Sequence, residues 1–153
     1  MHEAEPRFRW DLRVSSDADD QATVFVRRHA FAVGLPLQFD PAYGRITALE
    51  YVLGALGADL ANGLRAAAHR RRLAVDRVEA LVQGELDNAL THLGVVGERG
   101  HPGVRRISVK VFVSSFEPEA GIRSAWEETL ARSPLVRTFR DAMQLELTLQ
   151  VAH

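Results

Sequence analysis

The chain has 153 residues, of which 46% are hydrophobic and 25% are charged, and its formal net charge at pH 7 is −1. This length and apolar content are enough for one compact core, so we expect a single domain over residues 1–153. A net charge near zero gives no strong field that would attract nucleic acid or an anionic membrane, and we expect neither as a partner. The chain has no cysteine, which excludes disulfides, thiolate metal sites and thiol catalysis.

The sequence carries no recognisable targeting, membrane or metal signal. Its start, MHEAEPRFRW, is charged and lacks the apolar segment of a signal peptide. The longest mostly apolar stretch, residues 51–58, is far shorter than the roughly 20 residues that span a bilayer. The six histidines lack the spacing of a metal site. We therefore expect a cytoplasmic protein without a metal or another cofactor.

The N-terminal region is predicted to form strands. Apolar and charged residues alternate at its start, with Phe8, Trp10, Leu12 and Val14 against Arg7, Arg9, Asp11 and Arg13. This period of two is typical of a half-buried strand. A turn over residues 15–21 should follow, then a second strand from about Thr23 towards Val33, with room for a short third strand over residues 35–39. Together these elements would form a meander.

A long helix is expected next. Thr47 and Glu50 form a capping-box pattern, in which each side chain accepts a hydrogen bond from a free backbone N–H at the helix start. The first half of the helix is apolar nearly all round, which predicts burial on most sides, and Gly54 and Gly57 would allow another backbone to approach closely. The basic run over residues 69–72 is interpreted as a solvated helix end, because positive charge suits a helix C-terminus.

The remainder of the chain is predicted from the same kinds of signal. We expect strands over about 75–86, 104–113 and 143–151, a helix that begins at Pro118, and a short helix from Pro134 to about Asp141. The glycines at positions 94–103 lie in the connection between two strands, so they do not match a phosphate-binding loop. Ser133 precedes a proline at a helix start, which is the position of an N-cap.

Two segments carry a resemblance to a known family. Residues 48–59, ALEYVLGALGAD, follow the helix signature P-x-E-L-L-L-x-A-L-G-x-C of the OsmC/Ohr family, which this chain resembles. Glu50 matches the signature glutamate, whereas Ala48 replaces the proline and Asp59 occupies the cysteine position. The family's second motif, Cys-Pro, corresponds to Ser133-Pro134. The resemblance implies an α+β OsmC-like fold, in which an antiparallel sheet packs on a long buried central helix within an intertwined homodimer.

Asp59 and Ser133 replace the two cysteines that carry out the reaction of the family's peroxidases. The family's peroxidases attack the peroxide with one cysteine thiolate, and a second cysteine resolves the sulfenic acid. Neither Asp59 nor Ser133 can be oxidised and recycled in this way. The family's partner arginine comes from the N-terminal strand region, where Arg27 and Arg28 are candidates by location alone. The candidate pocket therefore contains Asp59, Glu50, Ser133 and Arg28, and the catalytic residues, where there are any, stay unknown.

Each candidate also has a structural interpretation. A carboxylate in an apolar helix must reach water, pair or stay protonated, so Asp59 is either a structural partner or a ligand-facing group. We expect it to be buried and bonded to an arginine or a backbone donor, with an N-terminal arginine such as Arg28, from the same or the partner chain, as the first suspect. Glu50 is a capping residue by its position, and nine residues of helix place it nearly opposite Asp59. Ser133 is an N-cap that lacks an assignable base.

Three functions are compatible with this sequence. The leading hypothesis is a cytoplasmic homodimer without cysteine peroxidase activity that binds a small molecule or is associated with stress. The second is an enzyme that uses Asp59 and an arginine as general acid and base in the former peroxidase pocket. The third is a structural or partner-binding module. An open pocket that contains Asp59 and an arginine favours the first two, and a filled site favours the third.

Overall fold

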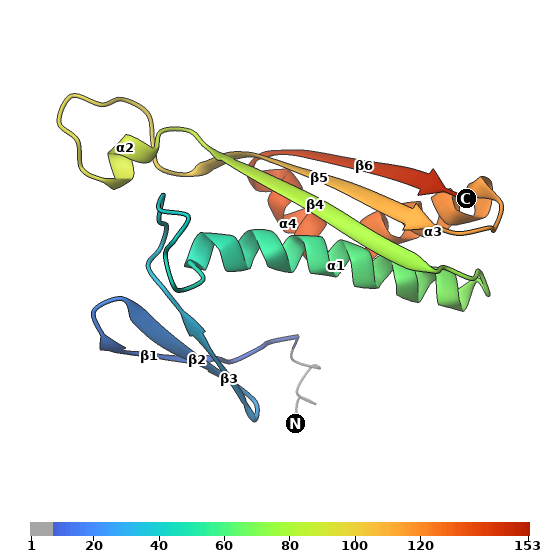
Figure 1. The fold of residues 1–153 in the computed structure, drawn as a ribbon, viewed down its shortest axis with the longest axis horizontal. Coiled ribbons are helices and arrows are strands. Elements are labelled where there is room, and N and C mark those ends of the chain that lie inside the picture. Colours follow the sequence, from blue (N-terminus) through green and yellow to red (C-terminus); the bar gives the residue numbers. More distant parts are fainter. Residues whose placement is uncertain (1–7) are drawn as a thin grey trace, which may run out of the picture. The chain divides into compact units, whose positions relative to one another are not determined.

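The structure, a computed structural model, describes residues 8–153. The chain divides into two compact units, one that ends at Val52 and one over Leu53–His153. Helix α1 (Ala48–Arg70) begins in the first unit and continues through the second (Figure 1). The expectation of a single domain stays a prediction, and the two units are described one at a time.

The first unit contains a three-stranded antiparallel sheet in the order β1-β2-β3. Its strands are β1 (Arg13–Ala18), β2 (Gln21–Val26) and β3 (His29–Val33). A two-residue turn at Arg27 and Arg28 joins the last two strands, and Arg27 adopts a left-handed conformation with φ of 52°. The predicted meander is therefore present.

The strand boundaries differ from the sequence prediction. β1 begins at Arg13 and runs through the expected turn, because it is held by backbone pairing with β2 and not by burial of an apolar face. The alternating side chains ahead of it are exposed, with Phe8 at 86% and Trp10 at 78%. Arg7, also assigned to that strand, lies outside the described residues. The single strand expected over residues 23–33 is a hairpin, because Arg27 allows a tight turn without glycine.

No strand forms over residues 35–39. The carbonyl oxygens of Leu35 and Pro36 instead accept hydrogen bonds from the N–H groups of Ala48 and Leu49, each over 3.1 Å. These N–H groups belong to the first turn of α1, where a helix has no internal partner for its donors. The segment therefore caps the helix and does not extend the sheet.

The predicted capping box of α1 is confirmed. The Thr47 N–H donates to Glu50 Oε1 over 2.9 Å, and the Glu50 N–H donates to Thr47 Oγ1 over 3.1 Å. At the other end, Arg72 is left-handed with φ of 57°, and the Leu73 N–H reaches back to the Ala68 carbonyl over 2.9 Å. Both helix ends are thus fixed by local hydrogen bonds.

The second unit is a three-stranded sheet with helices on one face (Figure 1). Its strands are β4 (Arg77–Leu86), β5 (Val104–Ser114) and β6 (Gln144–Ala152), and the short helix α2 (Ala89–His92) lies in the connection between β4 and β5. β4 and β5 are antiparallel, but β5 and β6 are parallel. The expected antiparallel sheet is thus a mixed sheet. The reason is that α3 (Glu119–Arg132) and α4 (Pro134–Ala142) carry the chain back to the end of the sheet where β5 begins. β6 can then run in the same direction as β5, as in a β-α-β crossover.

The core of the second unit lies between the helices and the inner face of its sheet. Its fully buried side chains come from α1 (Leu56, Leu60, Leu64, Ala67, Ala68), β5 (Ile107, Val109, Val111, Val113), α3 (Ile122, Ala125) and α4 (Val136). Gly57 allows α1 to approach β4, because a Cβ atom there would lie 2.7 Å from Val82 Cγ2. This packing fixes the position of α1 relative to α3 and α4, and so of the site described next. No helix of residues 8–153 is long and apolar enough to cross a membrane.

Candidate functional site

The residues at the two cysteine positions of the family motifs, Asp59 and Ser133, are in direct contact. Ser133 Oγ lies 2.5 Å from Asp59 Oδ2 and donates a hydrogen bond to it. Asp59 is on α1, and Ser133 is the elbow residue between α3 and α4. Residues that are 74 positions apart in the sequence therefore meet, as expected if both motifs serve one site.

Ser133 is held firmly in the elbow. As predicted, it is the N-cap of α4: its Oγ accepts a hydrogen bond from the Val136 N–H over 3.0 Å, with Pro134 in the first turn. Its own N–H donates to the Thr129 carbonyl at the end of α3 over 3.1 Å. The hydroxyl thus accepts from the helix and donates to Asp59. Its single proton points to that carboxylate, which is a weaker base than the histidine that usually activates a serine nucleophile.

Asp59 differs from the expectation in two ways. It is half-buried and not buried, and its hydrogen-bond donor is the Ser133 hydroxyl and not an arginine or a backbone N–H. Within residues 53–153, no arginine lies within ion-pair distance of its carboxylate. The physical reason is that Asp59 sits at the edge of the core beside a hollow. Partial contact with solvent and one hydroxyl donor take the place of a buried ion pair.

The Asp59–Ser133 contact forms one end of a pocket of about 140 Å³. The lining residues are Asp59, Gly63, Ala66 and Arg70 of α1, Thr129 and Arg132 of α3, and Ser133 and Pro134. The α1 residues follow one another at intervals of three or four, so they share one face of the helix. At Gly63 the two helices come close, because a Cβ atom there would lie 2.9 Å from Thr129 Cγ2. A narrow hollow with an acidic and a basic end results.

The basic end is organised around Glu128. Its Oε1 lies 3.4 Å from Arg70 Nη2 and 3.2 Å from Arg132 Nη1, and its Oε2 lies 3.3 Å from Arg71 Nε. Partial burial raises the pKa of Glu128. The hydrogen bond from Arg71 and the charges of Arg132, Arg70 and Arg71 outweigh this effect, and its pKa falls below the usual value. Glu128 is therefore a charged anchor for three guanidinium groups.

The sequence analysis did not identify Arg70 and Arg132 as pocket residues. Arg70 belongs to the run interpreted as a solvated helix end, and its side chain is indeed 49% exposed. The signal that could have found these residues is their position: Arg132 immediately precedes Ser133, and Arg70 lies eleven positions after Asp59, on the same helix face.

Glu50 is not part of this pocket. It lies about 13 Å from Asp59 along the axis of α1, at a rise of about 1.5 Å per residue. Its hydrogen bonds with the backbone and the side chain of Thr47 lower its pKa below the usual value. It also lines a separate hollow of about 120 Å³ with residues 38–41, Tyr43 and Arg45 of the first unit. These contacts are those of a helix cap.

Arg28 is exposed in the turn between β2 and β3 of the first unit. Its proposed role beside Asp59 stays a prediction. Within residues 8–153, no three His, Asp or Glu side chains come together in the manner of a metal site.

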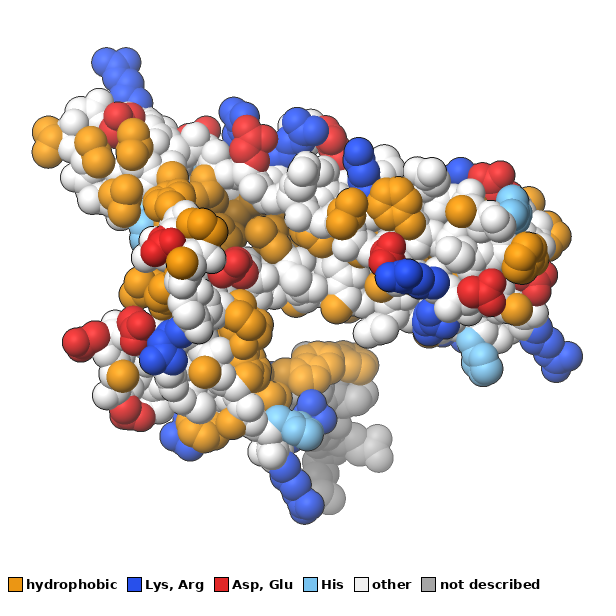
Figure 2. Space-filling view, viewed as in Figure 1, with side chains coloured by type: hydrophobic (Ala, Val, Ile, Leu, Met, Phe, Trp, Pro, Cys, Tyr) orange, Lys and Arg blue, Asp and Glu red, His pale blue; other side chains and the backbone are white. Residues whose placement is uncertain are grey.

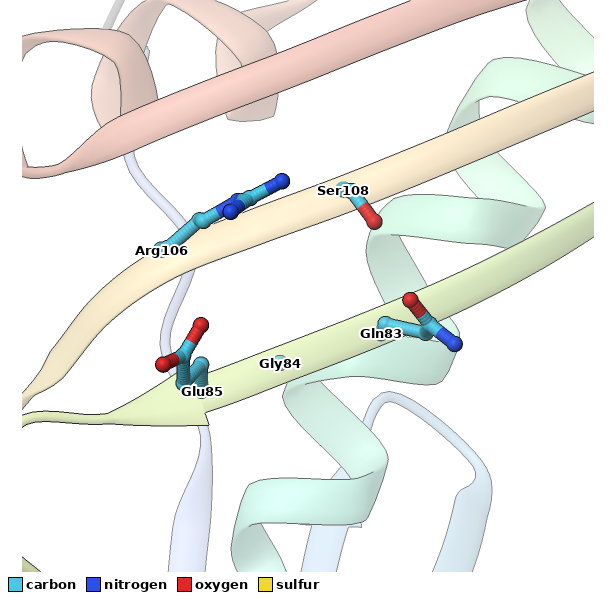
Figure 3. Close-up of a pocket in the computed structure, with 5 residues that line it drawn as sticks. All are labelled: Gln83, Gly84, Glu85, Arg106 and Ser108. Atoms are coloured by element: carbon cyan, nitrogen blue, oxygen red, sulfur yellow. The ribbon is translucent and has the colours of Figure 1, made fainter.

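A larger hollow of about 450 Å³ lies on the outer face of the second sheet (Figure 3). Its side chains are Gln83 and Glu85 of β4 and Arg106 and Ser108 of β5, which stand next to one another on the strands. Arg106 is already paired with Glu146 of β6 over 2.7 Å. All these groups rise from one face of the sheet, and this hollow is about as open to solvent as the Asp59 pocket.

The fold and the two joined motif positions define an α+β protein with a site between its long helix and a serine-proline elbow. The family described as OsmC-like protein matches residues 42–148 of this chain. The chain belongs to the OsmC-like family. The resemblance and the fold class predicted from the sequence are thereby confirmed.

Solved structures of low sequence identity share this fold. The OsmC-like protein of Mycoplasma pneumoniae has a TM-score of 0.77 at 15% identity, over 95% of this chain and 98% of that one. A putative osmotic stress induced and detoxification response protein from Psychrobacter arcticus gives 0.68 at 8% identity, over 96% and 100% of the chains. An organic hydroperoxide resistance protein OsmC from Legionella pneumophila gives 0.67 at 10% identity, over 93% and 98%. Comparison with curated protein sequences gave no match.

Proposed function

We propose that this protein is a cysteine-free member of its family that binds a small molecule between Asp59 and the Ser133 elbow and does not reduce peroxides. The observation that carries the proposal is the 2.5 Å hydrogen bond between Ser133 and Asp59 at the end of an open pocket. We also propose that it acts as a cytoplasmic homodimer. An association with stress is suggested by the name of the Psychrobacter arcticus protein.

The loss of peroxidase activity follows from the chemistry that the chain can supply. The Legionella pneumophila protein is named for organic hydroperoxide resistance. Peroxide reduction by a thiol consumes a thiolate and passes through a sulfenic acid, and this chain has no cysteine. The carboxylate of Asp59 and the hydroxyl of Ser133 have no comparable oxidation cycle.

Ligand binding is supported by the state of the Asp59 carboxylate. One oxygen, Oδ2, accepts from Ser133. Among the described residues, no buried side-chain oxygen lacks a hydrogen-bond partner, so Oδ1 lies where solvent or a ligand reaches it. A fixed and accessible acceptor in a hollow is a typical specificity element of a small-molecule site. A filled site would instead have favoured a purely structural module.

The homodimer is supported by uncovered apolar surface. α1 exposes Val52, Ala55, Ala58 and Ala66, although this helix is apolar on most sides. Figure 2 shows hydrophobic side chains gathered around α2, where Leu90 and Val96 are 43% and 98% exposed. Large uncovered apolar patches are rare on monomeric proteins and mark interaction surfaces. A second copy of the chain would cover such surfaces, as in the intertwined dimers that the family resemblance implies.

A general acid-base enzyme is the second candidate, because Arg70 and Arg132 line the same pocket as Asp59. In that case Asp59 would transfer a proton to or from a bound substrate, and an arginine would stabilise the developing negative charge. The hydrogen bond from Ser133 to Asp59 is compatible with binding and with catalysis. If the protein converts a bound ligand into a product, the enzyme hypothesis is favoured.

The test is a ligand screen read out by thermal stability and by NMR shifts of the purified chain. We expect compounds that raise the melting temperature of the wild type and shift the amide signals around Asp59 and Ser133. These effects should disappear in Asp59→Ala. They should persist in Asp141→Asn, a control for the loss of one carboxylate on α4, where Asp141 pairs with Arg137 at an exposed position. Ligands that bind equally well to Asp59→Ala would contradict the proposal.

A further inference from the structure

The basic end of the pocket is a pair of arginines held by a single oxygen. Glu128 Oε1 is within 3.4 Å of Arg70 on α1 and within 3.2 Å of Arg132 on α3. The Glu128 side chain is only 17% exposed, whereas those of Arg70 and Arg132 are 49% and 68% exposed. The carboxylate is thus the anchor, and the two guanidinium groups keep donors free towards the hollow that both residues line.

The charges around the hollow do not cancel. The charged residues that line the hollow are Arg70, Arg132 and Asp59, which leaves one positive charge, whereas Glu128 and Arg71 do not line it and pair with each other. A single guanidinium group offers two parallel N–H donors whose spacing matches the two oxygens of a carboxylate. The basic end therefore favours an anionic group of planar, bidentate shape.

The acidic end favours a hydrogen-bond donor on the ligand and not an anion. Ser133 has already committed its proton, so Asp59 offers only an acceptor to a ligand. Asp59 and Arg70 lie about 16 Å apart along the helix axis, and helical side chains lean towards the N-terminus, which brings the guanidinium of Arg70 back towards Asp59. A ligand that contacts both ends must therefore be elongated.

The volume of the pocket sets how much of that ligand lies within the hollow. The volume is about 140 Å³. With a liquid volume of about 30 Å³ per water molecule, this space accommodates about five to seven non-hydrogen atoms. A carboxylate already takes three of them, which leaves a short chain and one terminal polar group.

We infer that the ligand is a short monocarboxylate with a hydroxyl or ammonium group at its far end. The carboxylate binds between Arg70 and Arg132, and the terminal group donates a hydrogen bond to Asp59. Glu128 is a positioning residue that aligns the two arginines. This inference rests on the proposed function, because it names the ligand of the same Asp59 site.

The experiment is isothermal titration of the full chain with four probes of nearly equal length: 4-hydroxybutyrate, 4-aminobutyrate, butyrate and 1,4-butanediol. The first two should bind at least about tenfold more tightly than butyrate, because butyrate offers no hydrogen bond to the second carboxylate oxygen of Asp59. 1,4-Butanediol should bind more weakly than 4-hydroxybutyrate by a similar factor, because it offers no anion to the arginines.

Single substitutions assign these preferences to residues. Arg132→Gln should weaken 4-hydroxybutyrate at least about tenfold and leave 1,4-butanediol unchanged. Asp59→Ala should remove the difference between 4-hydroxybutyrate and butyrate. Ala66→Leu should abolish binding of every probe, because the larger side chain enters the hollow without a change in charge. Arg123→Gln is the matched control, since Arg123 lies on the same helix as Arg132 and pairs with Glu119.

The outcomes separate this inference from the proposed function. If 1,4-butanediol binds as tightly as 4-hydroxybutyrate and both need Asp59, the carboxylate specificity is overturned while the binding site stands. If no probe binds, the inference is overturned, and the broader ligand screen decides the proposed function. Equal losses in Arg132→Gln and Arg123→Gln would also overturn it, since only total charge would then matter. Circular dichroism of each variant confirms that it is folded.

Discussion

Replacing Ser133 with alanine should destabilise the protein more than replacing Asp59, although Asp59 is the charged member of the pair. Ser133→Ala removes two interactions, the cap of the Val136 N–H over 3.0 Å and the donor to Asp59 over 2.5 Å. Loss of an N-cap costs about 1 kcal/mol. Loss of a hydrogen bond to a charged group costs about 1.5–3 kcal/mol, and the half-buried position of Asp59 favours the lower end. The expected loss is therefore about 2–3 kcal/mol.

Asp59→Ala removes only the second interaction, since the hydroxyl of Ser133 still caps α4. We expect a loss of about 1–2 kcal/mol. This is less than the 3–5 kcal/mol that is typical of a broken buried ion pair, because Asp59 is half-buried and has no arginine partner within its unit. Ser133→Thr is the matched control: it keeps a hydroxyl and should lose less than Ser133→Ala.

Urea denaturation of the two single variants and of the double variant measures these quantities, and the double-mutant cycle isolates the coupling. We expect a coupling of about 1–2 kcal/mol between the two side chains. If the loss in Asp59→Ala equals or exceeds that in Ser133→Ala, or if the coupling vanishes, the hydrogen bond does not have the role assigned to it.

Four further predictions follow from the same structure. The purified, metal-free protein should not consume organic hydroperoxides with dithiol reductants, and reductant-dependent turnover would refute this. Sedimentation equilibrium should give twice 17.0 kDa, and a stable monomer at micromolar concentration would contradict the dimer. Because the pKa of Glu50 is lowered, its contribution to stability is full above its usual pKa of 4.5 and is lost as the pH falls through the depressed value. Glu50→Gln should therefore flatten the acid limb of a pH titration of the unfolding free energy. Gly57→Ala should cost about 1–3 kcal/mol, because its Cβ would meet Val82 Cγ2 at 2.7 Å, and Val82→Ala should recover part of this loss in a urea titration.

The parts of the fold that the sequence predicted well are those with strong local signals. The capping box at Thr47 and the serine-proline start of α4 are formed by residues within three or four positions of one another. The first sheet was placed less well, because the turn at Arg27 and Arg28 carries no glycine or asparagine to mark it. The parallel direction of β6 depends on how two helices cross the sheet, which is set by tertiary packing.

The candidate site was also predicted only in part from the sequence. Asp59 and Ser133 were identified because each departs from a motif, and their contact confirms that the two motifs meet. The arginines at the other end were missed, because Glu128 gathers them from the ends of α1 and α3, and neither end differs in composition from an ordinary basic helix terminus. A pocket formed where two helices end has no periodic signature in either of them.

The nature of the Asp59–Ser133 contact sets what this site can do. A hydroxyl that caps a helix and donates to a carboxylate has a fixed orientation, so the carboxylate is fixed in turn. Fixed groups recognise a ligand at low entropic cost, and the base beside Ser133 is a carboxylate, which takes a proton less readily than the imidazole that usually activates a serine nucleophile. The same contact thus favours selective binding through a fixed carboxylate acceptor. The arginines anchored by Glu128 extend this argument, because they add charge recognition at the far end of the pocket without adding a base.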